Sequence, residues 1–264
     1  MTEEIVGRHA EVEVNGSPMT VYLARPVRGD RLPVVLVGAE LWGLTAEVRA
    51  VADRVAALGY VAVVANLYHR CGPETATGLT ESDENRARAF ELLGTLTRDG
   101  VEADLRAAVA FAREQGDGSD TTGALGFSLG GHISYFAATR LDLAAAAIFY
   151  PGWLPVAGTA LSIPDPLLSY TSSIAERGTR LLILLAERDH VIDAEQRTAI
   201  DAALSQAGAE YELVVYPGAQ HAYFFPGRPV HDAAAAADSW QRVTELFAAK
   251  LGSVTDEFPA RASS

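Results

Sequence analysis

The sequence lacks several features that would assign it to a common class of protein. Its single cysteine, Cys71, cannot form a disulfide within the chain, which fits a reducing compartment. Basic residues are scarce: 21 Lys and Arg face 34 Asp and Glu, giving a net charge of −13 that argues against nucleic acid as a partner. No apolar run has the length of a membrane span, and the N-terminal stretch MTEEIVGRHAEVEV lacks the apolar core of a secretory signal. We therefore expect a cytoplasmic protein without a membrane partner.

The residues that are present favour a large α/β core. Hydrophobic residues make up 49% of the chain, and many of them form short, valine-rich runs typical of strands covered on both faces. The predicted strands are 32–39, 60–68, 121–128, 143–152, 179–187 and 210–218. Helix-like segments alternate with them at 45–58, 99–115, 129–140, 193–207 and 231–250. An alternating pattern on either side of Asn15-Gly16 predicts an antiparallel hairpin over 9–26.

This order of elements predicts one domain with a mostly parallel, doubly wound sheet, helices on both faces and an antiparallel N-terminal hairpin. We expect that domain to span residues 1–251 and to be followed by a loose tail over 252–264. The interval between the strands 143–152 and 179–187 is too short for a separate cap domain. No linker or internal repeat divides the chain.

One short motif predicts a catalytic nucleophile. Gly126, Ser128 and Gly130 form a G-x-S-x-G sequence where a predicted strand meets a predicted helix. Such a turn is crowded and strained, and it holds the serine oxygen clear of the sheet at the positive end of the helix. The peptide N–H of Leu129 is then placed to stabilise a developing oxyanion.

A serine nucleophile needs a base and an acid, and in this architecture they follow it in the order acid, then histidine. His221 lies directly after the last predicted strand, a placement that no other histidine shares. Asp189 lies in the loop after the strand 179–187, where its carboxylate can orient the imidazole. Glu187, Asp193 and Glu195 are the competing carboxylates in the same stretch, and a solvated charge cluster is the alternative interpretation.

Two further interpretations concern this acidic stretch. Asp193 is placed to cap the helix 193–207, with Gln196 completing a capping box. His190 with Asp189 and Asp193 is a second hypothesis, a metal site, although no second histidine stands at ligand spacing. We expect neither a metal nor another cofactor.

The motifs together resemble the dienelactone hydrolase family of α/β-hydrolases over roughly residues 10–250. The resemblance rests on GFSLGGHISY around Ser128, ERDHVI around Asp189 and YPGAQHAYFF around His221. GAELWGL (38–44) and NLYHRCGP (66–73) resemble the two active-site loops of the family. Membership implies a single-domain fold without a cap and hydrolysis of small esters or lactones without a cofactor. The enzyme that names the family has cysteine where this chain has Ser128.

The resemblance also implies roles in the pocket. Glu40 corresponds to a glutamate beside the nucleophile, and the Leu41 N–H to a second oxyanion donor. Arg70 corresponds to an arginine that pairs with this glutamate and holds an anionic substrate, and Arg228 is a second candidate for substrate contact. The candidates for apolar pocket walls are Trp42, Tyr68, Tyr150 and Phe225.

The resulting hypothesis is a serine hydrolase of small carboxylic esters or lactones, acting through an acyl-enzyme on Ser128. A thioesterase of the same mechanism and a non-catalytic α/β-hydrolase scaffold that binds a small ligand are the alternatives. Missing triad members would favour the scaffold, and none is missing here. We expect a monomer or a homodimer.

Overall fold

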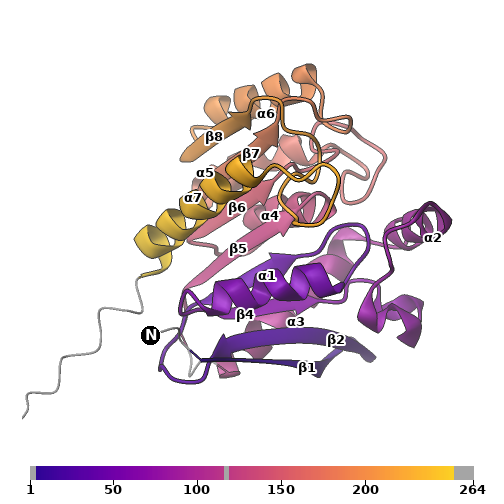
Figure 1. Ribbon diagram of the computed structural model, residues 1–264, viewed down its shortest axis with the longest axis vertical. Helices are drawn as coiled ribbons and strands as arrows, with labels where there is room; N and C mark the ends of the chain where they lie inside the picture. The colour runs from indigo at the N-terminus through magenta and orange to yellow at the C-terminus, as the bar shows by residue number, and fades with distance from the viewer. Residues whose placement is uncertain (1–3, 116–118, 253–264) are drawn as a thin grey trace, which may run out of the picture.

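The computed structural model describes residues 4–115 and 119–252, and within them eight strands form one sheet in the order β1-β2-β4-β3-β5-β6-β7-β8 (Figure 1). The strands are β1 (Ile5–Val14), β2 (Ser17–Pro26), β3 (Val34–Gly38), β4 (Val61–Ala65), β5 (Thr122–Phe127), β6 (Ala145–Phe149), β7 (Arg180–Ala186) and β8 (Tyr211–Tyr216). Strands β3 to β8 are parallel to one another. Their carboxyl ends therefore meet at one edge of the sheet, where ligands of such sheets bind.

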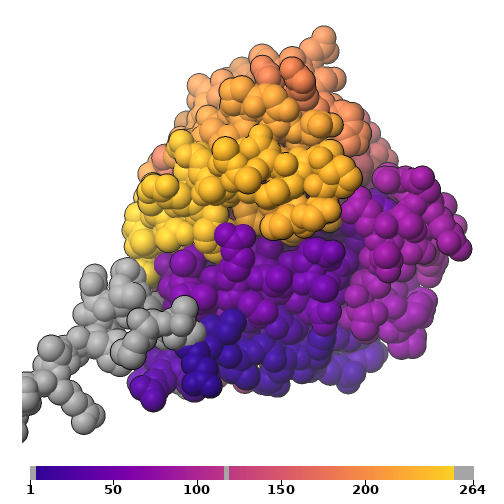
Figure 2. Space-filling view, in the orientation of Figure 1, coloured from indigo at the N-terminus to yellow at the C-terminus, as the bar shows by residue number. Residues whose placement is uncertain are grey.

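The hairpin β1–β2 is antiparallel and joins the sheet through β4. Its turn residues Asn15 and Gly16 have φ angles of 52° and 80°, the left-handed pair that a two-residue hairpin turn requires. Figure 2 shows this indigo hairpin at one end of the molecule and the orange segments that follow β6 at the other. The predicted hairpin and its turn position are thus confirmed.

Helices cover both faces of the sheet. They are α1 (Ala46–Ala56), α2 (Asp83–Leu93), α3 (Arg98–Gln115), α4 (Leu129–Arg140), α5 (Thr171–Arg177), α6 (Ala194–Gln206) and α7 (Ala233–Leu251), with 3₁₀ turns η1 (His69–Cys71), η2 (Pro73–Thr77) and η3 (Leu167–Tyr170). Helices α1 and α7 lie on the near face in Figure 1, while α3 and α4 lie behind the sheet. The predicted fold class is confirmed.

Two helices were not predicted from the sequence. Helix α2 is a polar segment with only Ala89, Leu92 and Leu93 buried, so its apolar stripe is too narrow to stand out. Helix α5 has seven residues, about two turns, and follows η3 directly. Between β6 and β7 the structure holds only η3 and α5, in agreement with the absence of a cap domain. The boundary between domain and tail stays a prediction, because residues 253–264 lie outside the described residues.

Helix α4 occupies the centre of the fold. Every residue from Leu129 to Thr139 is buried, because the helix lies against β5 and β6 on one side and contacts α3 and α5 on others. A helix buried all round has little freedom to shift. The residue in front of it, Ser128, is therefore held by the most enclosed helix of the described structure. No helix in the described part of the chain is long and apolar enough to cross a membrane.

His132 ties α4 to the segment that follows β6. Its Nδ1 lies 2.8 Å from the Gly152 carbonyl, and its Nε2 accepts a hydrogen bond of 3.2 Å from the Leu161 N–H. The first contact requires a proton on Nδ1 and the second a lone pair on Nε2, so the ring is neutral. Burial lowers the pKa of His132 to about 4. The segment that follows β6 is thus attached to α4 through an uncharged imidazole.

This attachment predicts acid sensitivity. Between pH 6.5 and about 4 the unfolded chain binds a proton at His132 and the folded protein does not, so stability falls as the pH falls. The contribution is about 3 kcal/mol in the free energy of unfolding over this window. In urea unfolding at a series of pH values, the free energy of unfolding of His132→Gln should therefore decrease less steeply with falling pH than that of the wild type. His190→Gln, which changes an exposed histidine, should show the same pH dependence as the wild type. Equal slopes for all three proteins would contradict the prediction.

Candidate active site

Ser128 stands at a strained turn between β5 and α4. Its backbone has φ 53° and ψ −114°, a conformation that L-residues rarely adopt. Such strained conformations persist only where the surrounding structure enforces them, and they cluster at functional sites. A Cβ at Gly126 would overlap the Gly130 carbonyl, and a Cβ at Gly130 would overlap the carbonyl of Gly38 at the end of β3. Both flanking positions of the motif therefore require glycine for close approach.

Ser128, His221 and Asp189 form one continuous chain of hydrogen-bonding groups. The Ser128 Oγ lies 2.9 Å from the His221 Nε2, and the His221 Nδ1 lies 2.8 Å from the Asp189 Oδ2. The Asp189 side chain is fully buried, and its Oδ1 also accepts from the backbone N–H groups of Val191 and Ile192. A carboxylate so fixed favours the tautomer with the proton on Nδ1, which leaves Nε2 free to accept the serine proton.

The competing carboxylates have other partners. Glu187 accepts a hydrogen bond from the Gly218 N–H at 2.8 Å, and Asp193 caps α6 by accepting from the Gln196 N–H at 2.8 Å. The predicted capping box is only half formed, because the Gln196 side chain donates to the Val191 carbonyl and does not accept a hydrogen bond from the backbone N–H of Asp193. The described residues hold no group of three or more His, Cys, Asp and Glu side chains arranged for a metal ion. The metal-site hypothesis therefore has no geometric support.

A cleft of about 330 Å³ opens in front of Ser128 and His221. Its wall includes Ser128, His190 and His221 from the loops at the strand ends, and Glu40, Leu41 and Trp42 from the loop after β3. Helix α2 adds Arg86 and Phe90, which the sequence analysis missed together with the helix itself. The one signal in the sequence is Phe90, a single aromatic residue in the otherwise polar stretch 83–91, and the structure leaves it 46% exposed.

The predicted apolar walls lie in different places. Trp42 lines the cleft, beneath the guanidinium of Arg86 at 5.5 Å from its ring centre. Tyr150 and Phe225 are buried below the site instead, where Tyr150 packs edge-on against the His221 ring at 4.9 Å. The Tyr150 ring thus supports the His221 ring from the core. Among the described residues, the Tyr150 hydroxyl has no hydrogen-bond partner.

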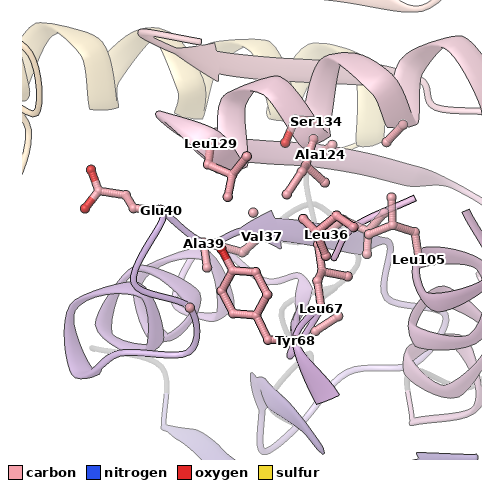
Figure 3. A pocket seen from close by; sticks show the side chains of 16 residues that line it. Leu36, Val37, Ala39, Glu40, Leu67, Tyr68, Leu105, Ala124, Leu129 and Ser134 are labelled. Atoms are coloured by element: carbon pink, nitrogen blue, oxygen red, sulfur yellow. The ribbon is translucent and has the colours of Figure 1, made fainter. Parts of the chain in front are cut away.

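Tyr68 also lies away from the cleft. It lines a small interior cavity of about 30 Å³, between the loop after β3 and α4, whose other walls are mostly aliphatic. Figure 3 shows its ring rising toward Ala39, while the Glu40 carboxylate points away from this cavity. The expectation that Tyr68 forms a wall of the substrate cleft was wrong, because its ring fills the space behind the loop.

The arginine that pairs with Glu40 is Arg228. Its Nη2 lies 2.6 Å from the Glu40 carboxylate and 3.3 Å from that of Glu81, and its guanidinium packs over the Phe225 ring at 4.6 Å. Burial raises the pKa of the Glu40 carboxyl above its ordinary value, and the Arg228 charge limits that rise. The pair places a compensated carboxylate in the wall of the cleft that also contains Ser128.

Arg70 was expected in that position, and the structure corrects this. Both of its terminal nitrogens bind the carboxylate of Asp104 on α3, at 2.7 and 2.8 Å. Asp104 is fully buried and also contacts His69 at 3.2 Å. A buried carboxylate without such partners would be costly, so it recruits the nearest guanidinium. Arg70 therefore points toward α3, and it does not line the cleft.

The two predicted oxyanion donors lie on the two sides of the elbow. The Leu129 N–H is the first of α4, where no carbonyl of the preceding turn is available to it. The Leu41 N–H has no acceptor among the backbone and side-chain groups of the described residues. Neither N–H group thus has a partner among the described contacts, and their role as oxyanion donors stays a prediction.

The Arg70 contact predicts a structural effect. Removing the side chain in Arg70→Ala leaves the buried Asp104 with His69 as its remaining side-chain partner. We expect the free energy of unfolding, measured in urea, to fall by about 1–3 kcal/mol. Arg106→Ala, which removes an exposed pair with Glu102, should change it by less than about 0.5 kcal/mol. An Arg70 variant as stable as the wild type would refute this assignment.

Comparisons with known proteins identify the family of the chain. The family model described as "Dienelactone hydrolase family" matches residues 19–251. Two relatives named "Putative carboxymethylenebutenolidase" are 34% identical over 235 residues (Synechocystis sp., 87% of this chain and 91% of the relative) and 31% identical over 234 residues (Salmonella typhi, 88% and 83%). A crystal structure of a "Putative Dienelactone Hydrolase" from Klebsiella pneumoniae has a TM-score of 0.82 at 27% identity and covers 93% of this chain and 99% of that one. The resemblance seen in the motifs is confirmed, and the chain belongs to the dienelactone hydrolase family.

Proposed function

We propose that the protein hydrolyses small carboxylic esters or lactones through an acyl-enzyme on Ser128. The observation that carries the proposal is the unbroken series Ser128 Oγ, His221 and Asp189, with contacts of 2.9 and 2.8 Å, at the wall of an open cleft. Neutral serine is a poor nucleophile, and an adjacent oriented imidazole is what activates it. The curated relatives carry the names of lactone-cleaving enzymes, including a "Probable 2-oxo-3-(5-oxofuran-2-ylidene)propanoate lactonase" from Bradyrhizobium sp..

In the first half-reaction, the Ser128 Oγ attacks the carbonyl carbon while the His221 Nε2 takes its proton. The imidazolium that forms is stabilised by the buried Asp189 carboxylate. The carbonyl oxygen becomes an oxyanion, for which the N–H groups of Leu129 and Leu41 are the donors. Collapse of this intermediate breaks the C–O bond, and His221 returns the proton to the leaving alcohol or to the ring oxygen of a lactone.

In the second half-reaction, water replaces the alcohol. His221 takes a proton from the water as its oxygen attacks the acyl carbon of the Ser128 ester, and a second oxyanion forms at the same donors. Collapse releases the carboxylic acid and returns the proton to the Ser128 oxygen. Glu40 takes no part in these steps, and its pairing with Arg228 prevents an uncompensated negative charge from facing the oxyanion.

The charges around the cleft favour a substrate that carries its own carboxylate. Arg86 reaches the cleft from α2 and is half exposed, and its only carboxylate partner among the described residues is Asp83, at 3.6 Å. Arg228 is committed to Glu40 and Glu81. Arg86 is therefore the cation that a substrate anion can approach with the least competition.

The central prediction concerns the nucleophile and its base. Ser128→Ala and His221→Ala should each lower kcat for 4-nitrophenyl acetate by about a thousandfold or more, because the activated nucleophile is lost. The control is Ser134→Ala, a buried serine of α4 that lines the interior cavity and not the cleft. A fluorophosphonate should label the wild type at Ser128, located by mass spectrometry. A wild type no faster than Ser128→Ala on ester, lactone and thioester substrates would overturn the proposal.

A second prediction concerns charge selection. In Arg86→Gln, kcat/KM for 4-nitrophenyl hemisuccinate should fall by about fivefold relative to that for neutral 4-nitrophenyl butyrate, as expected for one partly exposed ion pair. Arg88→Gln is the matched control, since Arg88 lies on the same helix with similar exposure but outside the cleft wall. Selection by Arg86 is excluded if the two variants show the same ratio of anionic to neutral activity.

A further inference from the structure

The loop that carries Leu41 is held from behind by the segment that follows β4. The Tyr68 hydroxyl donates a hydrogen bond of 3.1 Å to the Leu41 carbonyl, and the Leu79 N–H donates one of 2.7 Å to the Trp42 carbonyl. The Leu41 carbonyl belongs to the peptide that directly follows the one containing the Leu41 N–H, and the Trp42 carbonyl belongs to the peptide after that. Within the loop itself, the Gly43 N–H bonds the Glu40 carbonyl at 3.0 Å. The orientation of Leu41 therefore depends on contacts from outside the loop as well as on its own turn.

The Tyr68 side chain is well suited to this contact. Its ring is 4% exposed and packs beside the interior cavity, where Figure 3 shows it next to Ala39. Burial raises the pKa of the Tyr68 phenol far above neutrality, so the group remains a protonated donor. A buried hydroxyl that lost this acceptor would be left unsatisfied.

The backbone of Tyr68 is fixed in turn. Its N–H donates to the Asn66 Oδ1 at 3.2 Å, and its carbonyl accepts from the Thr75 Oγ1 at 3.2 Å. The two residues that follow, His69 and Arg70, bind the buried Asp104 carboxylate on α3. The contacts thus form a continuous path from α3 through the segment after β4 to the Leu41 carbonyl.

We propose that Tyr68 is a positioning residue for the oxyanion site, holding the Leu41 peptide so that its N–H stays aimed at the developing oxyanion. The proposal rests on the function proposed above, in which Leu41 supplies the second donor. An N–H in a loop contributes fully to transition-state stabilisation only if it is oriented before the reaction begins. Tyr68 does not touch the cleft and has no direct contact with Ser128 or His221 among the described contacts.

The test is Tyr68→Phe, which removes the hydroxyl and keeps the ring. Because complete loss of an oxyanion donor costs about 10²–10³ in kcat, a loosened donor should lower kcat for 4-nitrophenyl acetate by about ten- to hundredfold. KM should change by less than about twofold, since the lost interaction belongs to the transition state. The matched control is Tyr60→Phe: the Tyr60 hydroxyl also donates to a backbone carbonyl, that of Gly252 at 3.2 Å, at the other end of the sheet.

A second readout separates positioning from general loss of structure. A phenylboronic acid adds to the serine oxygen and forms a tetrahedral anion, so its affinity should fall in Tyr68→Phe by about the same factor as kcat. Urea unfolding of the two variants should show comparable losses, because each loses one hydrogen bond to a backbone carbonyl. Asp104→Asn weakens the ion pairs that attach His69 and Arg70 to α3, and it should lower kcat by a smaller factor than Tyr68→Phe.

The outcomes are distinct. The proposal is supported if Tyr68→Phe has a lower kcat and a lower boronate affinity with the same KM, while Tyr60→Phe keeps the kcat and boronate affinity of the wild type. An unchanged kcat in Tyr68→Phe, or an equal loss of kcat in Tyr60→Phe, overturns the proposal. Because the wild type is active in that case, the proposed hydrolase function still stands. A wild type that neither turns over esters nor reacts with a fluorophosphonate at Ser128 overturns the proposed function itself. If Tyr68→Phe does not fold, an unchanged kcat in Asp104→Asn still overturns the proposal that contacts from α3 through Tyr68 position the Leu41 peptide.

Discussion

The close contact between the end of β3 and the start of α4 is the constraint on which the candidate site depends. At Gly38 and Gly130 the two backbones approach so closely that an added Cβ on either residue would collide with the carbonyl of the other, and a Cβ on Gly126 in β5 would collide with the Gly130 carbonyl. This approach brings the Ser128 turn next to the loop that begins at Ala39. Ser128 and the Leu129 N–H are therefore placed by close backbone packing.

The order of strands in the sheet brings His221 and Asp189 close to Ser128. Strands β5 to β8 are adjacent and parallel, so the loops after β7 and β8 emerge at the same edge as the elbow after β5. Asp189 is held there by backbone N–H groups and His221 by the aromatic core beneath it. Residues 93 positions apart in the chain thereby come within hydrogen-bond distance.

The distribution of arginines shows how buried carboxylates organise the loops. Asp104 and Glu40 are both enclosed, and each takes one guanidinium, Arg70 for the first and Arg228 for the second. The first pair anchors the segment after β4 to α3, and the second compensates a negative charge in the cleft wall that contains Ser128. Arg86 reaches the cleft as a half-exposed cation, so the charge available to a substrate comes from α2.

The sequence by itself determined the order of strands and helices, the hairpin turn and the position of the serine elbow. These features depend on local patterns: valine-rich runs, the Asn15-Gly16 pair, and glycines spaced around Ser128. Motif similarity also indicated the family. Local pattern was insufficient for α2, because a polar helix held by three buried residues has no clear periodicity.

Only the tertiary structure decided which charged groups meet. The family resemblance implied Arg70 as the partner of Glu40, whereas the structure pairs Glu40 with Arg228 and commits Arg70 to the fully buried Asp104 on α3. Tyr68 looked like a pocket wall, yet its hydroxyl contacts the Leu41 carbonyl 27 positions earlier in the chain. Such pairings depend on burial and on chain segments that pack together, and neither is encoded in local spacing.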